Sequence, residues 1–406
     1  MTKTLLIVSG GVQAVHGILR AKALGYHVVV SDKNPAAPGF AVADDHIVAS
    51  TYHPDETVQG VVEYCKTKGR IDGVITIGCD APLTVAKVAE RFGLTGIPVE
   101  TAALAQDKLA MKIRFAEAGI PIPWFSPVAS ATEMRSLARQ RDYQVVVKPV
   151  DSRGSRGVQR LQSSMDLDAA FLLAASQSPT GRVMLEGYLR GPQISTESVL
   201  INGKGFTPGF SDRNYEYLDR YAPFFIENGG DLPSHLDQAT QHAVKQTAEA
   251  AGRALGVSTG NIKGDIVVCD GKPYVIELAA RASGGYFCTR EIPLNTGVDF
   301  IGAVIKLALG EPFNPETLVP QQLTPVVQRY AFPRPGRVTS ISGIDEARSV
   351  PGIEELVVTV QTGDVIPEPT HSGCTSAMVL ATGASVADAK KSAQVALNAL
   401  RIETVA

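Results

Sequence analysis

The 406-residue sequence contains few cysteines and no long hydrophobic run, and these absences exclude several classes of protein. The five cysteines are scattered and form no C-x-x-C pair, which argues against a disulfide framework or a zinc site and favours a reducing compartment. No stretch approaches the length of a membrane span, and the apolar run near the N-terminus is too short for a signal peptide. We therefore expect a cytoplasmic protein with no membrane partner.

Charge of either sign is also not in excess. The formal net charge is −3 at pH 7 and the sequence pI is about 6.2, which gives no indication of a nucleic-acid partner. The apolar content of 44% is ordinary for a globular protein, and the length predicts roughly two or three domains. The seven histidines have no spacing typical of metal ligands, so we assign them no function.

The first hundred residues alternate apolar strands with helices, which predicts a parallel sheet covered on both faces. The turn after the first strand, Ser9 to Ala14, lacks a proper G-x-G-x-x-G pattern. Asp32 ends the second strand, where a dinucleotide fold has its ribose-binding acid, but the glycine pattern favours a Rossmann-like scaffold without a dinucleotide. The expected strands are 5–8, 27–30, 46–48 and 73–77, and the expected helices are 12–24, 56–68 and 80–92.

A helix is expected after Asp107, which can cap it, with Gly119 as its end. Leu109, Ile113 and Ala116 are expected to share its apolar face. Lys108 lies in the first turn, where it opposes the helix dipole, so in isolation it is interpreted as a solvated surface lysine.

The strand 144–150 contains Lys148 within an otherwise apolar run, and a buried ammonium requires an anionic partner. The glycine- and serine-rich segment 152–157 follows it, and such a loop can direct backbone N–H groups at phosphate oxygens. The order is not that of a Walker A motif, because the lysine precedes the loop. We interpret Lys148 and the loop as a phosphate site rather than as an edge lysine and a flexible turn.

The segment from Gly264 to Glu277 predicts a β-hairpin, because two apolar runs flank a turn that contains Asp270 and Gly271. With a three-residue loop, Cys269 opposes Pro273 and Asp265 lies directly opposite Glu277. Opposed side chains have Cβ atoms roughly 5 Å apart, so two carboxylates there repel unless a cation lies between them. Mg²⁺ fits this requirement, because it binds carboxylate oxygens together with substrate phosphates. Two solvated acids on an exposed hairpin are the alternative.

The order of these features resembles the ATP-grasp superfamily of ligases over nearly the full chain. The resemblance rests on the Rossmann-like start, the helix with Asp107 and Lys108, the strand with Lys148, the loop 152–157, a hinge at 186–189 and the acidic hairpin. It implies an α/β ATP-grasp fold with a Rossmann-like domain at 1–105, an ATP-grasp domain at 106–330 with a lid at about 124–190, and an α+β region at 331–406. The strands at 336–341, 352–360 and 377–383 and the helix at 385–400 resemble the C-terminal region of biotin carboxylase and the L-amino acid ligases.

The resemblance also implies roles for single residues. Arg281 would be catalytic and contact the transferred phosphoryl group, and Asp265 and Glu277 would hold Mg²⁺, with Mn²⁺ as an alternative. The residues implied in ATP binding are Lys108, Lys148, Ser152, Gly154, Ser155, Gly157, Val158, Glu186, Tyr188, Leu189 and Glu197. The residues assigned to the substrate are Arg213, Arg220, Glu227, Ser283, Gly284 and Gly285.

One position departs from the pattern of many ATP-grasp enzymes, which is Glu-x-Asn-x-Arg. The segment here runs from Glu277 to Arg281 with Ala279 in place of the asparagine, and alanine cannot ligate a metal. A similar pattern occurs in L-amino acid ligases. The favoured interpretation is a ligase that joins a small-molecule carboxylate to an amine through an acyl phosphate. The alternatives are a decayed ATP-binding protein and a biotin-carboxylase-like or purine-pathway enzyme. A homodimer is a family-level expectation.

Overall fold

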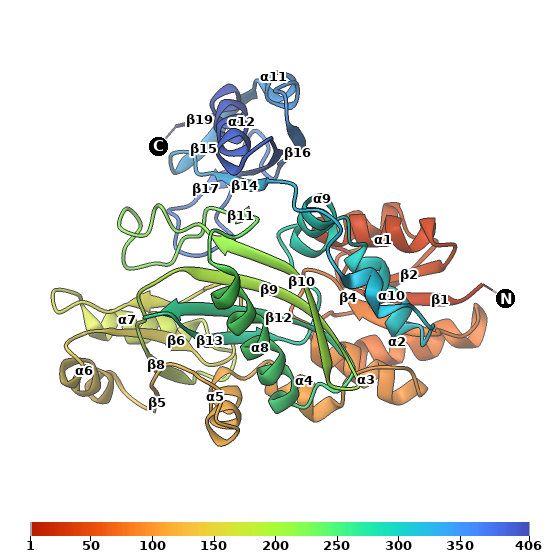
Figure 1. Ribbon diagram of the computed structural model, residues 1–406, viewed down its shortest axis with the longest axis horizontal. Helices are drawn as coiled ribbons and strands as arrows, with labels where there is room; N and C mark the ends of the chain where they lie inside the picture. Colours follow the sequence, from red (N-terminus) through yellow and green to blue (C-terminus); the bar gives the residue numbers. More distant parts are fainter. Residues whose placement is uncertain (1, 406) are drawn as a thin grey trace.

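The N-terminal unit is a four-stranded parallel sheet with the strand order β3-β2-β1-β4. The computed structural model describes residues 2–405, and this unit lies at the red and orange end of the chain in Figure 1. The elements are β1 (Thr4–Val8), α1 (Val15–Ala23), β2 (His27–Asp32), β3 (Asp45–Val48), α2 (Pro54–Thr67), β4 (Gly73–Thr76), α3 (Pro82–Phe92) and α4 (Val99–Leu104). The predicted parallel sheet is confirmed.

Two details of this unit differ from, or explain, the predictions. The expected helix at 12–24 begins as a short 3₁₀ turn, Val12–Ala14, and becomes α-helical only at Val15. A second 3₁₀ turn, Pro38–Ala41, follows β2. Asp32 accepts a hydrogen bond from the backbone N–H of Gly10, at 2.8 Å, and so ties the end of β2 to the first turn.

A second unit has its own sheet and its own hydrophobic core. Its sheet has the order β5-β8-β6-β7, and two helices cover it. The elements are β5 (Phe125–Val128), α6 (Ala131–Gln140), β6 (Val145–Pro149), β7 (Gln159–Arg160), α7 (Leu167–Ser176) and β8 (Val183–Gly187). α5 (Lys108–Glu117) precedes this unit, and Asp107 caps that helix by accepting a hydrogen bond from Ala110 N–H, as predicted.

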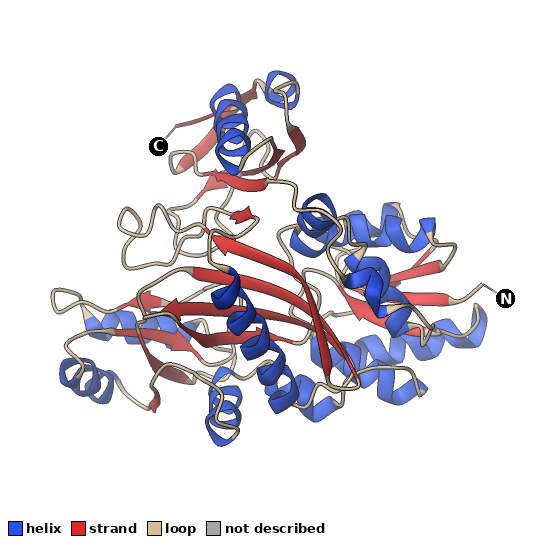
Figure 2. Ribbon diagram, in the orientation of Figure 1, coloured by secondary structure: helices blue, strands red, loops and turns tan. Residues whose placement is uncertain are grey.

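An eight-stranded antiparallel sheet forms the centre of the molecule, with the order β13-β12-β9-β10-β11-β14-β18-β16 (Figure 2). α8 (Gln238–Leu255) lies against it. The strands are β9 (Gln193–Ile201), β10 (Lys204–Arg213), β11 (Gly230–Leu232), β12 (Gly260–Cys269), β13 (Lys272–Ala279), β14 (Val326–Ala331), β16 (Ile353–Val358) and β18 (Ala377–Thr382). Both faces of β9 are buried near its centre, since Thr196, Glu197 and Ser198 are all fully buried between neighbouring strands and covering elements.

The hairpin of β12 and β13 brings Asp265 opposite Glu277, as predicted, but the predicted loop was wrong. The turn has two residues, Asp270 and Gly271, both at positive φ, and Cys269 pairs with Lys272. A β-bulge beside Asp265 then takes up one extra residue, Ile276, and restores the register that the shorter turn would have lost. The shorter turn and the bulge offset one another, so Asp265 still lies opposite Glu277.

The C-terminal region extends the central sheet rather than standing apart from it. β14 pairs with β18, so the expected boundary at 330 falls inside a strand of the shared sheet. The segment before it, with a π-helix at Phe287–Glu291, α9 (Ile292–Thr296), α10 (Phe300–Ala308) and a 3₁₀ turn at Pro315–Leu318, includes residues that pack with α1 and β4 in one core. The remaining elements are β15 (Gly336–Ser342), α11 (Ile344–Arg348), β17 (Val365–Ile366), α12 (Val386–Ala399) and β19 (Arg401–Val405). Within residues 2–405, no helix is long and apolar enough to cross a membrane.

Candidate functional site

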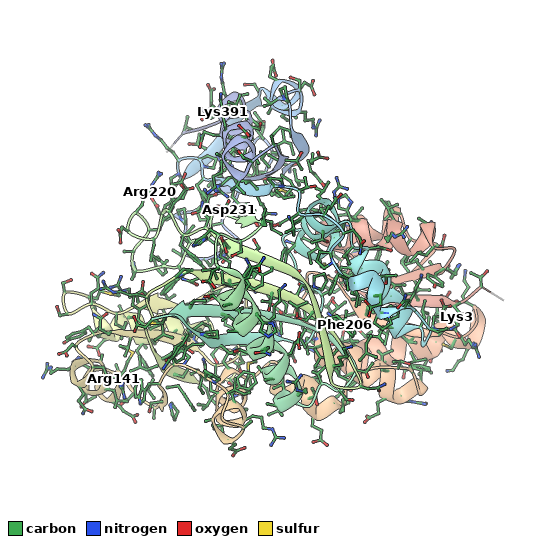
Figure 3. All side chains as sticks on the ribbon, in the orientation of Figure 1. Lys3, Arg141, Phe206, Arg220, Asp231 and Lys391 are labelled. Atoms are coloured by element: carbon green, nitrogen blue, oxygen red, sulfur yellow. The ribbon has the colours of Figure 1, made fainter. Side chains whose placement is uncertain are left out.

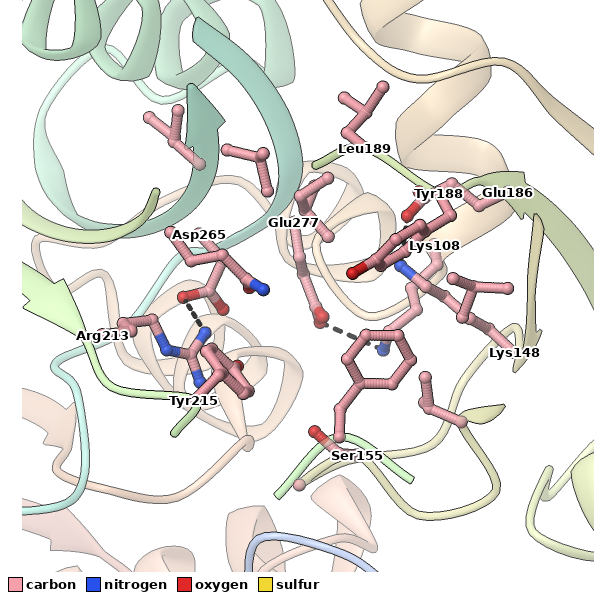
Figure 4. A pocket seen from close by; sticks show the side chains of 18 of the residues that line it. Lys108, Lys148, Ser155, Glu186, Tyr188, Leu189, Arg213, Tyr215, Asp265 and Glu277 are labelled. Carbon is pink, nitrogen blue, oxygen red and sulfur yellow. Dashed lines mark hydrogen bonds and ion pairs between the residues drawn. The ribbon is translucent and has the colours of Figure 1, made fainter. Parts of the chain in front are cut away.

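Two cavities meet at the acidic hairpin. The first, with a volume of about 880 Å³, lies between the second unit and the central sheet and is called the nucleotide cavity below. The second, of about 1290 Å³, opens toward the N-terminal unit and is called the acceptor cavity. The residues that line both are Gly154, Ser155, Arg213, Asp265 and Glu277. Figure 4 shows the two carboxylates side by side at this junction.

The two carboxylates of the junction are each paired with cations. Asp265 contacts Lys263 and Arg213, with 2.7 Å to Arg213 Nη1, and Glu277 Oε1 lies 3.0 Å from Lys108 Nζ. Burial alone would raise the pKa of Asp265, but Arg213 and Lys263 hold it well below its usual range. Asp265 is therefore charged without a metal, and the basic side chains offset the repulsion that we expected between the two carboxylates.

The pair fits a divalent cation of the magnesium type. Two opposed carboxylates supply oxygen ligands, and Mg²⁺ completes its shell with phosphate oxygens and water. Within residues 2–405, no group of three or more histidine, cysteine, aspartate or glutamate side chains forms a metal site. Ala279 lines the acceptor cavity beside the pair and adds no ligand.

A buried cluster of three ionisable side chains borders the nucleotide cavity. Glu186, from β8, contacts both Lys148 on β6 and Lys112 on α5, with 2.5 Å to Lys112 Nζ. Burial would raise the pKa of Glu186, but the two lysines lower it. Burial and the neighbouring Lys148 lower the pKa of Lys112 to about 8 against the opposing effect of Glu186. The anionic partner that the sequence required for Lys148 is therefore Glu186.

Lys112 was missed by the sequence analysis, because the face of α5 was assigned wrongly. Its buried residues are Met111, Lys112 and Phe115, whereas Ile113 is 46% exposed. The true face also follows the helical spacing, but a lysine within it conceals the pattern. Lys108 lies on the same side, is largely buried, and donates to the carbonyl oxygen of Ser152 at 2.7 Å, so it is not a solvated surface lysine.

The glycine loop 152–157 contacts the N-terminal unit on one side and the C-terminal region on the other. The guanidinium of Arg153 lies over the ring of Tyr52, 4.1 Å from its centroid. On the other side, Ser372 N–H donates to Gly154 O at 3.3 Å. The predicted residues Ser152, Gly154 and Ser155 of the loop, and Val158 directly after it, line the nucleotide cavity.

Gly157 does not line the cavity, and its role is conformational. It has φ +74°, and a Cβ atom there would lie 2.9 Å from Pro149.

Glu186, Tyr188 and Leu189, which belong to the predicted hinge, line the nucleotide cavity. Tyr188 supports the guanidinium of Arg160 at 4.2 Å from its ring centroid.

Besides Gly157, two predicted site residues lie outside both cavities. Glu197, assigned to ATP binding, is fully buried and accepts a hydrogen bond from Ser283 N–H at 3.1 Å. Its burial raises its pKa to about 7. Arg220, assigned to the substrate, lies beside the rings of Tyr217 and Tyr221 on the loop after β10, away from the cavities (Figure 3). The sequence contains no signal that places either Glu197 or Arg220 in a cavity.

The other predicted substrate residues line the acceptor cavity, namely Arg213, Glu227, Ser283, Gly284 and Gly285. Arg281 also lines it and donates from Nε to Asp80 Oδ1 at 2.7 Å. Burial would lower the pKa of Arg281, but Asp80 and the acids Glu197 and Asp265 raise it.

The N-terminal unit supplies residues that the sequence analysis did not assign. Asp80 and Gly78 follow β4, and Gln13 follows β1, so all three lie at the carboxyl ends of parallel strands. Open α/β sheets bind ligands at this edge, and that rule could have identified them. Gln13 Oε1 accepts a hydrogen bond from Gly285 N–H at 3.1 Å, which joins the unit to the glycine turn after Arg281.

Comparison with known proteins agrees with this geometry. Residues 105–285 match the ATP-grasp domain family, and residues 329–405 match the L-amino acid ligase C-terminal domain 2. The uncharacterized protein y4rH of Sinorhizobium fredii (strain NBRC 101917 / NGR234) is 26% identical over 380 residues, which is 90% of this chain and 76% of that protein.

Solved structures have the same fold. The L-amino acid ligase from Bacillus licheniformis superposes with a TM-score of 0.84 at 21% identity, covering 100% of this chain and 99% of that one. The biotin carboxylase–βγ-ATP complex from Campylobacter jejuni gives a TM-score of 0.73 at 20% identity, covering 99% of this chain and 92% of the other.

These matches identify residues 105–285 as an ATP-grasp domain, and the whole chain has the fold of the ATP-grasp structures that it superposes on. The C-terminal region, residues 329–405, is of the L-amino acid ligase type.

Proposed function

We propose that this protein uses ATP to activate a carboxylate as an acyl phosphate and then joins it to an amine, releasing ADP and phosphate. The observation that carries the proposal is that Asp265 and Glu277 line both cavities. A phosphoryl group that passes from a nucleotide in one cavity to an acceptor in the other would cross at these carboxylates. The ATP ligand of the biotin carboxylase complex supports the assignment of the nucleotide cavity.

The chemistry requires two bond exchanges. A carboxylate oxygen of the acceptor attacks the γ-phosphorus of ATP, and the bond from that phosphorus to the bridging oxygen of ADP breaks. The amine nitrogen then attacks the acyl carbon, the bond from carbon to the phosphate oxygen breaks, and the nitrogen loses a proton. Negative charge accumulates on phosphate oxygens in the first step, so fixed cations aimed at them lower the barrier.

The residues of this chain would divide that work. Lys108 and Lys148 would hold the phosphates, and the glycine loop would cover them with backbone N–H groups. Arg281, held by Asp80, would bind the acceptor carboxylate and the transferred phosphoryl group through its planar fork. Asp265 and Glu277 would hold Mg²⁺ or Mn²⁺, which supplies charge neutralisation at the phosphate oxygens. The second unit, 125–187, would act as the lid over the nucleotide.

The match of residues 329–405 supports an amino acid as the carboxylate. The test measures ADP release with ATP and Mg²⁺ across a panel of L-amino acids, each paired with hydroxylamine, which captures an acyl phosphate as a hydroxamate. ADP and hydroxamate should form in equal amounts and only with both the acid and Mg²⁺ present. ATP binding without ADP release for any acid would instead favour a nucleotide-binding protein without turnover, the alternative favoured by Ala279.

A further inference from the structure

Each carboxylate at the junction of the two cavities has one oxygen paired with a cation and one oxygen left over. Asp265 pairs through Oδ1, which contacts Lys263 Nζ and lies 2.7 Å from Arg213 Nη1. Glu277 pairs through Oε1, which lies 3.0 Å from Lys108 Nζ. Within residues 2–405, Asp265 Oδ2 and Glu277 Oε2 accept no hydrogen bond. One divalent cation therefore has one oxygen of each carboxylate available to it.

The pairing of the strands places Lys263 on the acceptor side of these carboxylates. Lys263 and Asp265 lie two residues apart on β12, so their side chains leave the same face of the sheet. Lys263 lines the acceptor cavity but not the nucleotide cavity, whereas Asp265 lines both. The ammonium therefore approaches Asp265 from the side on which the acceptor would lie.

Ala279 is the direct partner of Lys263 on the neighbouring strand β13, and it also lines the acceptor cavity. Opposed Cβ atoms are roughly 5 Å apart, so a longer polar side chain at this position would reach the carboxylate pair. The methyl group of Ala279 offers no ligand oxygen and leaves room for the lysine, which is only 15% exposed. A second metal ion on this side would meet an ammonium, a methyl group and an oxygen that is already paired.

Two acids hold the ammonium in place. Lys263 contacts Asp265 on its own strand and is the register partner of the fully buried Glu197 on β9. Burial raises the pKa of Glu197, and the charge of Lys263 opposes that effect. Lys263 is thus a fixed positive charge in the floor of the acceptor cavity, next to the carboxylates at which a phosphoryl group would cross.

We propose that Lys263 supplies to the transferred phosphoryl group the positive charge that a second metal ion would supply, so that the enzyme works with a single divalent cation. This inference rests on the proposed function and concerns the same site. Two-metal sites place a cation at both the attacking and the leaving oxygen of a phosphoryl transfer. Lys263 lies on the attacking side, because the acceptor cavity would hold the attacking carboxylate.

The role of the lysine in the step is electrostatic. As the carboxylate oxygen of the acceptor bonds to the γ-phosphorus and the bond from phosphorus to ADP breaks, the ammonium donates a hydrogen bond to a phosphoryl oxygen. Lys263 keeps its proton throughout, so the step needs no further reactant. A fixed donor of this kind stabilises charge that develops in the transition state.

The number of bound ions tests the proposal without turnover. Mn²⁺ is titrated into protein held in excess over a non-hydrolysable ATP analogue, and electron paramagnetic resonance measures the free Mn²⁺. The wild type should bind one ion per nucleotide complex. Two ions in the wild type would overturn the inference while leaving the proposed function intact. No bound ion would overturn the metal site of the proposed function and this inference with it.

A double variant tests whether Lys263 occupies the place of an ion. Lys263→Ala together with Ala279→Asp removes the ammonium and adds a carboxylate beside Asp265 and Glu277. This protein should bind two Mn²⁺ ions under the same conditions, with its fold checked by a circular dichroism melt. A folded double variant that binds a single ion would show that the lysine does not occupy a metal place, and the proposal would fail.

Turnover tests the contribution of the charge. Lys263→Met should lower kcat for ADP release by at least about 30-fold, because one fixed donor at a developing charge contributes two to three orders of magnitude. The Kd of the Mg²⁺-bound ATP analogue should change by less than about threefold, since Lys263 lies outside the nucleotide cavity. Lys263→Arg keeps a charge and should retain at least about a tenth of the parental kcat. Parental kcat in Lys263→Met, or equal losses in both variants, would overturn the proposal.

Lys272 provides a matched control on the same hairpin. It pairs with Cys269 at the turn, is exposed, and lines neither cavity. Lys272→Met should keep the parental kcat and bind one Mn²⁺ ion. A loss of kcat equal to that of Lys263→Met would show that the hairpin, rather than the ammonium of Lys263, is responsible, and the proposal would fail. If the wild type releases no ADP with any acid, the proposed function fails, and the ion counts alone decide this inference.

Discussion

Arg281 Nε lies 2.7 Å from Asp80 Oδ1, so the N-terminal unit holds the guanidinium that follows β13. The contact joins residues 201 positions apart in the chain. It places the planar fork of Arg281 in the acceptor cavity, next to the carboxylates at which the two cavities meet.

Arg281→Lys should keep the charge and lose the fork. We expect ATP–Mg²⁺ binding to survive, while turnover falls by one to three orders of magnitude, roughly 1.4 kcal/mol for each factor of ten. Calorimetry with ATP–Mg²⁺ and an ADP-release assay measure the two properties separately. Arg290→Lys, whose guanidinium pairs with Glu355 outside the cavities, is the matched control and should turn over normally. Parental turnover in Arg281→Lys would place the phosphoryl-transfer site elsewhere.

Lys148→Ala should weaken nucleotide binding, because it removes a charge aimed at phosphate. We expect the Kd for ATP to rise about 10- to 100-fold, since charge-assisted contacts contribute roughly 1.5–3 kcal/mol. Isothermal calorimetry measures this Kd. A circular dichroism melt of Lys148→Ala establishes that the variant stays folded, since Glu186 still pairs with Lys112. Lys87→Ala, which breaks a surface pair with Asp55, should leave ATP affinity unchanged. An unchanged Kd in Lys148→Ala would refute the phosphate role.

ATP should stabilise the fold more strongly with Mg²⁺ than in EDTA. Repulsion between Asp265 and Glu277 is not the reason, because basic side chains offset it. Both acids already have basic partners, and a metal would release Arg213, Lys263 and Lys108 toward phosphate. We expect a rise in Tm of about 2 °C or more with Mg²⁺–ATP and a smaller rise with ATP in EDTA. Equal shifts under the two conditions would count against the metal site.

Lys112 predicts a pH dependence of stability with a definite sign. Its pKa is lowered from 10.5 to about 8 on folding, so between these values the unfolded chain binds more protons than the folded one. The free energy of unfolding therefore rises with pH across this range relative to a variant without the lysine. The free energy of unfolding of the wild type minus that of Lys112→Met should increase by roughly 1 to 3 kcal/mol from pH 7.5 to 10.5. Urea unfolding at both pH values measures it, and a difference that stays constant or shrinks would contradict the lowered pKa.

The sequence was a reliable guide where one local rule decided the outcome. Buried strands alternating with helices predicted the parallel sheet of the N-terminal unit, and Asp107 capped α5 as expected. The opposition of Asp265 and Glu277 was predicted from pairing, but the bulge at Ile276 could not be, because a two-residue turn and a bulge give the same register as a three-residue loop.

Features that depend on long-range packing were not predictable. The buried face of α5 includes Lys112 only because Glu186, 74 positions away in the chain, lies beneath it. Glu291 enters the acceptor cavity from a segment that no motif marks, and only the assembled fold brings it near Glu227. Glu197 shows the converse, since a polar residue centred in a strand is buried there by neighbours on both sides.

The glycine loop touches Tyr52 near the start of the chain and Ser372 near its end. If the loop covers ATP as we propose, it must break both contacts each time it moves aside to admit or release the nucleotide. Substitution of Tyr52, which lines neither cavity, should then alter the rate of nucleotide exchange without touching the hairpin.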